Sequence, residues 1–381
     1  MRRSRFPKNV PPILAGRSGQ RRSPRRSAKK SLAACKLDGD TIYDMREIIL
    51  PGACDCHIHV VGSMDVFPQT ASRSYTAAPA EIQSLRQVAE PLGVTRFVVV
   101  QPSFYGTDNS CVLEALDKLG DSGRGVAVVD PKSTTPRELE SFGRRGICGL
   151  RLNFFSSSVA DPHRQLERSL AEALDILPRP GWHIEIIARA ATLAAAAPSI
   201  AKVDVPIVVD HYGLPENEDP KGPIGRALLD LAALPHVWMK LSAPYRCSAN
   251  VLSTTPPAEW LQAFLQAAPD RCVWGSDWPH TPPHKQGEVN QPYRNIAYGR
   301  LFGDFLGALA SPEIARRILA RLSMQEEPVG ASFTVSIGIA VQGGVAANFD
   351  RMYRDADTAL YHAKGEGKSR ITLFAPFMTA A

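Results

Sequence analysis

The chain has 381 residues, of which 44% are hydrophobic and 22% charged, and its formal net charge at pH 7 is +6. This is ordinary globular composition, and the absence of an uninterrupted run of about 18 apolar residues argues against a membrane span. The seven cysteines form no Cys-x-x-Cys pair, which argues against a disulfide framework and predicts a cytoplasmic protein with reduced thiols.

The excess positive charge belongs to an N-terminal arm. Residues 1–36 contain twelve lysines and arginines and no acidic residue, so the rest of the chain has a net charge of −6. Few apolar residues and several Pro and Gly predict that residues 1–45 form a basic, disordered arm. Such an arm suits a polyanion or a transit peptide, but an incidental basic extension is the simplest interpretation. We expect no membrane partner, and no nucleic-acid partner beyond any contact made by residues 1–36.

Eight short apolar runs then follow, and several of them are separated by Ala- and Leu-rich helical stretches such as residues 80–93 and 169–177. This alternation is typical of βα units around a parallel sheet. Eight units predict an α/β fold, a (β/α)8 TIM barrel over residues 46–323. The predicted strands are residues 53–61, 96–103, 124–130, 147–154, 182–188, 205–211, 237–242 and 272–278.

Polar side chains gather at or just beyond the carboxyl ends of these predicted strands. A barrel enzyme builds its active site from residues at this end of its strands. The sequence therefore predicts one shared site. Its candidate residues are His57, His59, Gln101, Ser103, Arg151, Asn153, Asp210, His211, Arg246, Asp277 and His280.

The pair His57 and His59 has more than one possible role. Alternating strand side chains place both imidazoles on one side. Two neutral imidazoles can bind Zn or Mn, with His211 and Asp277 as further ligands. The same imidazoles can instead hydrogen-bond a carbonyl oxygen and stabilise the oxyanion formed when water attacks it. A purely structural H-x-H pair is also common, so the pattern alone leaves these alternatives open.

Asp277 and two arginines suggest hydrolysis. A carboxylate among apolar walls can have its pKa moved toward the working pH, where it takes a proton from water. Arg151 and Arg246 are planar donors suited to clamping a substrate carboxylate. The alternatives are that Asp277 caps a turn and that Arg151 pairs with a core carboxylate. Together these residues predict hydrolysis of a small anionic ester or amide.

Five segments resemble one family: "CDCHIHVVGSMDVFP", "VVVQPSFYGTDN", "GICGLRLNF", "IVVDHYGLP" and "VWGSDWPH". They are similar to the amidohydrolase superfamily, in the branch close to 2-pyrone-4,6-dicarboxylate lactonase. The resemblance implies a (β/α)8 barrel that opens carboxylated or sugar-acid lactones without a metal. Asp277 would activate water while His57, His59 and His211 hydrogen-bond the substrate. Metal-dependent relatives have a histidine at the end of strand 5, where this chain has Ile187.

The departures from this pattern concern the substrate. An arginine and a tyrosine of the pyrone lactonase correspond here to Ser157 and Ile187, which argues against the same dicarboxylate. The residues expected to bind substrate are Arg151, Arg246, Tyr75, Ser103 and His280. We expect an anionic lactone with one carboxylate or several hydroxyls, and no cofactor. The alternative is a Zn- or Mn-dependent amidohydrolase or decarboxylase that uses His57, His59, His211 and Asp277 as ligands.

A second resemblance begins after the barrel. Residues 324–375, with "FTVSIGIAV" and "YRDADTALYHAKGEGKSRITLF", are similar to the last strand, helix and strand of a GGDEF diguanylate cyclase domain. The nucleotide-binding turn and the metal-binding first half of that domain are missing, so no cyclase activity is expected. Residues 324–381 are therefore predicted to be a partial α/β fragment without a catalytic role. A further alternative is an inactive fusion product with only an association or binding role.

Overall fold

The computed structural model describes residues 52–155, 160–282, 291–309, 311–320, 337–339, 358 and 371–373. The predicted arm, Ser157 and most of the predicted C-terminal fragment lie outside these ranges. None of the described helices is long and apolar enough to cross a membrane.

Eight parallel strands pair in chain order, each with the next. The circle closes between the first and last strands, where the His59 N–H donates to Trp278 O at 2.7 Å and the Asp277 N–H to His57 O at 2.8 Å. The predicted (β/α)8 barrel is confirmed. The strands are β1 (Ala53–Ile58), β2 (Val94–Val100), β3 (Gly123–Ala127), β4 (Ile147–Asn153), β5 (His183–Ile187), β6 (Ile207–Val209), β7 (Val237–Ser242) and β8 (Cys272–Gly275).

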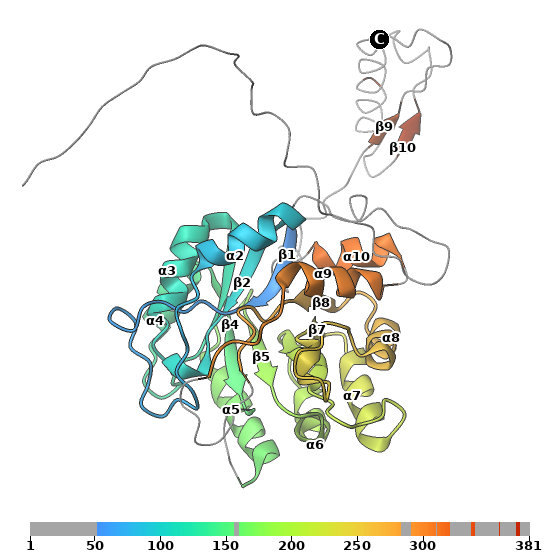
Figure 1. Ribbon diagram of the computed structural model, residues 1–381. Coiled ribbons are helices and arrows are strands. Elements are labelled where there is room, and N and C mark those ends of the chain that lie inside the picture. The colour runs from blue at the N-terminus through green and yellow to red at the C-terminus, as the bar shows by residue number, and fades with distance from the viewer. Residues whose placement is uncertain are drawn as a thin grey trace, which may run out of the picture. The chain divides into compact units, whose positions relative to one another are not determined.

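Helices surround the strands (Figure 1). The α-helices are α2 (Ile82–Ala89), α3 (Ser110–Leu119), α4 (Pro136–Arg144), α5 (Pro162–Ile176), α6 (Ala190–Ile200), α7 (Pro223–Ala233), α8 (Ala258–Ala267), α9 (Tyr298–Gly307) and α10 (Pro312–Leu319). Short 3-10 helices are η1 (Glu90–Leu92), η2 (Ser103–Tyr105), η3 (Gly120–Ser122), η4 (His211–Gly213) and η5 (Pro244–Arg246). Local signals set several helix starts. For example, Thr135 and Glu138 form a capping box around α4, with Pro136 in its first turn.

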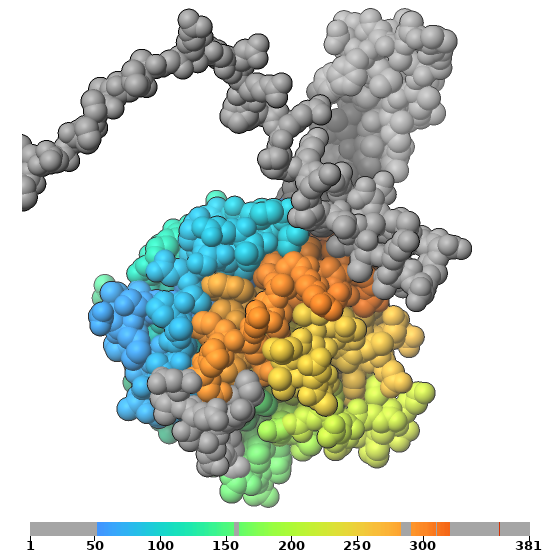
Figure 2. All heavy atoms as spheres, in the orientation of Figure 1, coloured from blue at the N-terminus to red at the C-terminus, as the bar shows by residue number. Residues whose placement is uncertain are grey.

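The seam between β1 and β8 is covered by the last two helices of the barrel. Trp274 of β8 packs against Tyr298, Phe302 and Phe305, all from α9. On the face shown in Figure 2, the orange α9 and α10 segments lie beside the cyan α2 segment. These contacts bury the outer side of the seam and so fix the two strands that carry His57 and Asp277.

Strand β1 contains a bulge that changes which side chains face the barrel interior. Asp55 pairs with Phe97 and Ile58 with Val99, so β1 has one residue more than β2 over this step. Before the bulge, Cys54 and Cys56 belong to the buried interior cluster with residues of other strands. After it, His57 and His59 face the interior instead.

Close packing of β1 against β8 depends on Gly275. A Cβ atom at this position would lie 2.6 Å from the His57 Cβ and 2.9 Å from the His57 backbone nitrogen. Only glycine lets the two strands approach this closely. The seam therefore positions His57 through backbone contact as well as through hydrogen bonds.

Two short strands are described after the barrel. They are β9 (Ile337–Ile339) and β10 (Ile371–Leu373), and they pair in parallel. Both fall within the segments for which strands were expected, and Thr358 between them is helical.

Candidate active site

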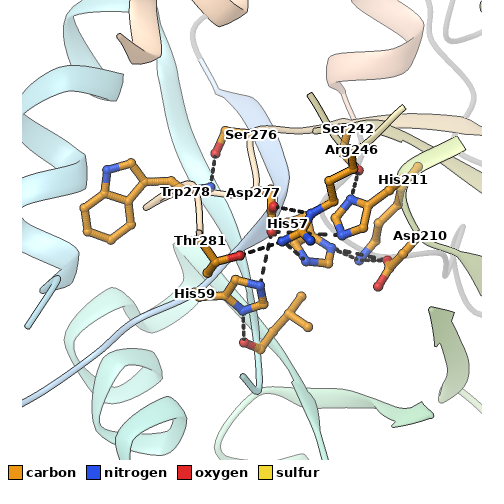
Figure 3. A network of polar contacts seen from close by, with 12 residues as sticks. His57, His59, Asp210, His211, Ser242, Arg246, Ser276, Asp277, Trp278 and Thr281 are labelled. Atoms are coloured by element: carbon orange, nitrogen blue, oxygen red, sulfur yellow. Dashed lines mark hydrogen bonds and ion pairs between the residues drawn. The ribbon is translucent and has the colours of Figure 1, made fainter. Parts of the chain in front are cut away.

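Four predicted residues meet where the strands end (Figure 3). Every one of them is buried. The Nε2 atoms of His57, His59 and His211 lie 3.6, 3.2 and 4.0 Å from Oδ1 of Asp277. His57 belongs to β1, while the other three follow β1, β6 and β8 directly. Several predicted strands were therefore too long at their carboxyl ends. The backbone pairing between strands stops where the chain turns and brings these residues into the site.

The two oxygens of Asp277 have different surroundings. Oδ2 accepts hydrogen bonds from the Tyr245 hydroxyl at 2.7 Å and from the Arg246 Nε at 2.8 Å. Oδ1 faces the three imidazoles and has no aligned hydrogen-bond donor among the described residues. Oδ2 is thus anchored by two hydrogen bonds, while the buried Oδ1 keeps its acceptor capacity.

The charge environment of Asp277 differs from the one expected from sequence. Burial by itself raises the pKa of this carboxyl, but Arg246, His211 and His59 outweigh burial and hold the pKa well below its ordinary value. The expectation that apolar walls move the pKa of Asp277 toward neutrality was wrong, because the guanidinium of Arg246 bonds the carboxylate directly. Asp277 is therefore ionised throughout the physiological range.

The histidines are oriented by hydrogen bonds on their far side. His59 Nδ1 donates to Val100 O at 2.8 Å, and His211 Nδ1 lies 2.8 Å from the Ser242 hydroxyl. Burial lowers the pKa of His57 well below its ordinary value and lowers that of His211 to about 3. Both rings are therefore neutral at physiological pH.

A layer of buried charges lies beneath the histidines. Lys240 of β7 contacts Glu185 of β5 and lies 3.3 Å from Asp210 Oδ1. Arg151 of β4 donates to Asp210 at 3.3 Å and to Gln101 O at 2.9 Å. Two cations thus face two carboxyl groups, and burial together with the charge on Asp210 raises the pKa of Glu185 to about 7. The pairing of Arg151 with a core carboxylate, the alternative raised from the sequence, is present.

His57 links this layer to the site. Its Nδ1 accepts a hydrogen bond from the Lys240 ammonium at 3.1 Å. Asp210 Oδ1 lies 3.2 Å from the same nitrogen but outside hydrogen-bond alignment. A neutral imidazole that accepts at Nδ1 has its proton on Nε2.

Two groups of side chains have the spacing of a metal site. They are His57 with Asp210 and His211, and His57 with His59 and Asp277. Both groups need a lone pair from His57. Lys240 Nζ contacts Nδ1 of His57, and a neutral ring that accepts there carries its proton on Nε2. A His57 ring in that tautomer offers no lone pair to a metal ion.

A small pocket is lined by His59 and Arg246, two residues that contact Asp277, while Asp277 itself is not part of its lining. It encloses about 30 Å³, room for a water molecule, and Tyr75, Ser103, Arg151 and Arg246 all line it as predicted. The remaining lining residues are His59, Pro102, Asn153, Phe155, Ile187 and Thr281.

Two of the predicted substrate-binding residues have less access to substrate than expected. Arg246 is engaged with Asp277 and with the Thr281 hydroxyl at 2.5 Å. His280 is buried outside the pocket lining, against the Tyr245 ring.

The backbone at the site is strained. His211, Ala243, Asp277 and His280 have positive φ angles between 49° and 67°. Such conformations cost about 1–3 kcal/mol each in non-glycine residues and cluster at functional sites. All four residues follow β6, β7 or β8, where the chain turns sharply to bring side chains inward.

Sequence reasoning missed three residues of the site, Tyr245, Glu185 and Lys240. A signal existed for the last two, since each is a charged residue inside an otherwise apolar strand that must pair when buried. Tyr245 precedes Arg246 in a turn and gave no comparable signal. No local sequence pattern indicated that the Tyr245 hydroxyl contacts Asp277.

Comparison with known proteins assigns the family. The model of the family described as Amidohydrolase matches residues 54–319. The chain belongs to the amidohydrolase family. The matched range includes all of the barrel strands apart from Ala53, and it includes His57, His59, His211 and Asp277.

Two relatives have described activities. A 4-sulfomuconolactone hydrolase from Rhizobium radiobacter is 32% identical over 233 residues, which cover 60% of this chain and 76% of that protein. A 2-pyrone-4,6-dicarboxylate hydrolase from Comamonas testosteroni is 31% identical over 241 residues, covering 60% of this chain and 77% of that protein.

Solved structures share the barrel. A probable 2-pyrone-4,6-dicarboxylic acid hydrolase from Acinetobacter baumannii, with citric acid bound, has a TM-score of 0.54 and 26% identity. The match covers 70% of this chain and 96% of that chain. A structure from Agrobacterium tumefaciens with a TM-score of 0.58 and 24% identity, covering 71% of this chain and 93% of that chain, shows the same fold.

Proposed function

We propose that this amidohydrolase opens a small anionic lactone, with Asp277 as the base that activates water. The observation that carries the proposal is that the two oxygens of Asp277 have different surroundings. Oδ2 accepts hydrogen bonds from Tyr245 and Arg246, while Oδ1 faces the imidazoles. The activities described for the two relatives support the same substrate class.

The proposed reaction begins with attack by water and ends with cleavage of the ring ester bond. Water bonds to the lactone carbonyl carbon as Oδ1 of Asp277 takes one of its protons. Negative charge develops on the carbonyl oxygen, which accepts a hydrogen bond from Nε2–H of His57. The bond between the carbonyl carbon and the ring oxygen then breaks, and the proton held by Asp277 passes to that oxygen. The product is a hydroxy acid, and Asp277 is ionised again.

The substrate carries at least one anionic group in this proposal. Arg151 and Arg246 line the pocket, and Tyr75 and Ser103 add hydroxyl donors. Since both guanidiniums already bond protein groups, only their remaining N–H groups are available to a substrate carboxylate. This limited capacity favours a lactone with one carboxylate or several hydroxyls.

No metal takes part in the proposed reaction. Two features support this: the hydrogen bond from Lys240 to His57, and Ile187 at the tip of β5. Metal content well below one equivalent, together with turnover that persists in chelator, would support it. Stoichiometric Zn or Mn whose removal abolishes turnover would favour the metal-dependent alternative.

Asp277→Asn tests the base directly. The amide oxygen can still accept from Tyr245 and Arg246, but the side chain cannot take a proton from water. We expect kcat on an active lactone, found by screening carboxylated lactones in chelator, to fall about 10²- to 10⁴-fold. Asp175→Asn, on the exposed side of α5, is the control and leaves kcat unchanged. A kcat for Asp277→Asn within about threefold of wild type would remove Asp277 from the mechanism.

The two ends of the chain play no part in this reaction as proposed. Residues 1–45 remain a predicted basic arm, and residues 324–381 a predicted GGDEF-like fragment without cyclase activity. A cytoplasmic location likewise remains a prediction.

A further inference from the structure

We infer that Lys240 is a positioning residue that keeps His57 in the tautomer with its proton on Nε2, so that His57 acts as a hydrogen-bond donor beside Asp277 rather than as a metal ligand. This inference deepens the proposed function and rests on it for the catalytic consequence. The tautomer itself stands on the geometry around Lys240 and can be measured without substrate.

Lys240 has three acceptors around one ammonium group. They are Glu185, Asp210 at 3.3 Å and His57 Nδ1 at 3.1 Å. An ammonium has three hydrogens and no lone pair, so it donates hydrogen bonds to Glu185 and His57, and it forms an ion pair with Asp210. Lys240 is 1% exposed, which excludes water as a competing partner on most of its surface.

The charge on Lys240 is maintained by the same contacts. Burial alone lowers the pKa of a lysine, but Asp210 and Glu185 outweigh burial and raise the pKa of Lys240 above its ordinary value. The charged ammonium also disfavours a second proton on His57. Both effects leave a neutral ring whose single proton lies on the nitrogen that faces Asp277.

Without Lys240, the opposite tautomer becomes favourable. Asp210 Oδ1 lies 3.2 Å from His57 Nδ1 and has no aligned donor among the described residues. A small ring rotation would let Nδ1–H donate to this carboxylate. The lone pair on Nε2 would then face Asp277, and the donor for the oxyanion would be lost.

Nitrogen NMR of protein labelled with ¹⁵N-histidine measures the tautomer directly, and His57→Asn identifies the signals of His57. We expect wild type to show a protonated Nε2 and an unprotonated Nδ1 between pH 6 and 8. The variant Glu185→Gln/Lys240→Met removes one anion and one cation and leaves the Arg151–Asp210 pair in place. In this double variant we expect the proton on Nδ1. Glu185→Gln alone keeps Lys240 and therefore keeps the wild-type pattern.

Kinetics provide the second measurement. Loss of one oxyanion donor lowers kcat about 10²- to 10³-fold. We expect the double variant to show a loss in this range with KM changed by less than about threefold. A merely structural role for Lys240 would lower the amount of folded enzyme without moving the proton on His57.

Each outcome has a distinct meaning. Wild-type His57 protonated on Nδ1 would overturn the inference, as would an unchanged Nε2 proton in the double variant. If the proton moves as expected but kcat does not fall, the tautomer assignment stands and the catalytic role proposed for His57 fails. Stoichiometric binding of Co²⁺ to wild type through His57 would also overturn the inference, whereas binding gained only in the double variant would support it.

Discussion

The carboxylate of Asp277 combines full burial with a strongly lowered pKa. A buried base normally gains basicity, but Arg246 removes that gain because its guanidinium bonds the carboxylate directly. The arrangement keeps the base ionised at every physiological pH. Among the groups that lower the pKa of Asp277, Arg246 has the largest effect.

Arg246→Met should therefore change the pH dependence of the reaction. Asp277 must be ionised to act, and in wild type its pKa lies well below 3.8, so it contributes no acid limb to kcat/KM near neutrality. Without the guanidinium the pKa rises, and the acid limb moves to higher pH. A pH profile of kcat/KM between pH 4 and pH 9 measures this shift.

Tyr245→Phe is the matched control for this profile. It removes a hydrogen bond to the same oxygen, Asp277 Oδ2, but removes no charge. Its acid limb should move less than that of Arg246→Met. Equal shifts in the two variants would mean that hydrogen bonding, rather than the charge on Arg246, sets the pKa of Asp277.

The seam between β1 and β8 depends on a second buried carboxylate, Asp55. Its Oδ1 accepts from the backbone N–H groups of Ser276 at 2.9 Å and His57 at 3.2 Å. Its Oδ2 accepts from the Tyr298 hydroxyl at 3.0 Å. Asp55 thus connects the strand that bears His57, the strand before Asp277 and helix α9.

Burial raises the pKa of Asp55 to about 6, despite its hydrogen bonds. Because the folded protein holds this proton more tightly than the unfolded chain, this group lowers the free energy of unfolding as pH rises from about 4 to 6. The loss is about 3 kcal/mol once Asp55 is ionised. Asp55→Asn keeps acceptors for both N–H groups and carries no charge. Urea unfolding at pH 5 and pH 8 should show a smaller decline for this variant than for wild type.

Asp55→Ala provides the contrast, because it removes the acceptors together with the charge. It should be less stable than Asp55→Asn at both pH values, by about 1–3 kcal/mol. An Asn variant with the same pH-dependent decline as wild type would assign that decline to another group.

Gly275→Ala tests the backbone contact across the same seam. The new methyl group would lie 2.6 Å from the His57 Cβ, so β1 must move. We expect a loss of about 1–3 kcal/mol in unfolding free energy and a fall in kcat, because His57 is displaced. Gly303→Ala in α9 is the control, since its Cβ meets no atom within 4 Å. Equal stability and kcat for both variants would contradict this account of the seam.

The elements were easier to predict from sequence than the contacts between them. Eight apolar runs with polar residues at their ends were enough to identify the barrel and to gather His57, His59, His211 and Asp277. The bulge in β1 was hidden, because Asp55, His57 and His59 have the alternating spacing of a regular strand, although Asp55 contacts helix α9 and the two histidines face the interior. Pairing of Glu185 with Lys240 joins β5 to β7 across the interior, and no local pattern encodes a distance between two strands.

Across the whole chain, the chemistry depends on residues of the barrel. The site residues described here lie between His57 and Thr281. We therefore expect a chain ending at residue 323 to keep the kcat and KM of the full chain. Size-exclusion chromatography of both forms checks whether association changes. A shorter chain with lower kcat, but unchanged folding by circular dichroism, would assign the C-terminal segment a role in activity.

The bulge in β1 also separates two tasks along one strand. Even-numbered positions 54 and 56 serve packing, while odd-numbered positions 57 and 59 serve chemistry. Substitutions at Cys54 and Cys56 can therefore change the packing of this strand without replacing His57 or His59. Deleting Cys56 would remove the extra residue, restore simple alternation and leave His57 and His59 facing the interior.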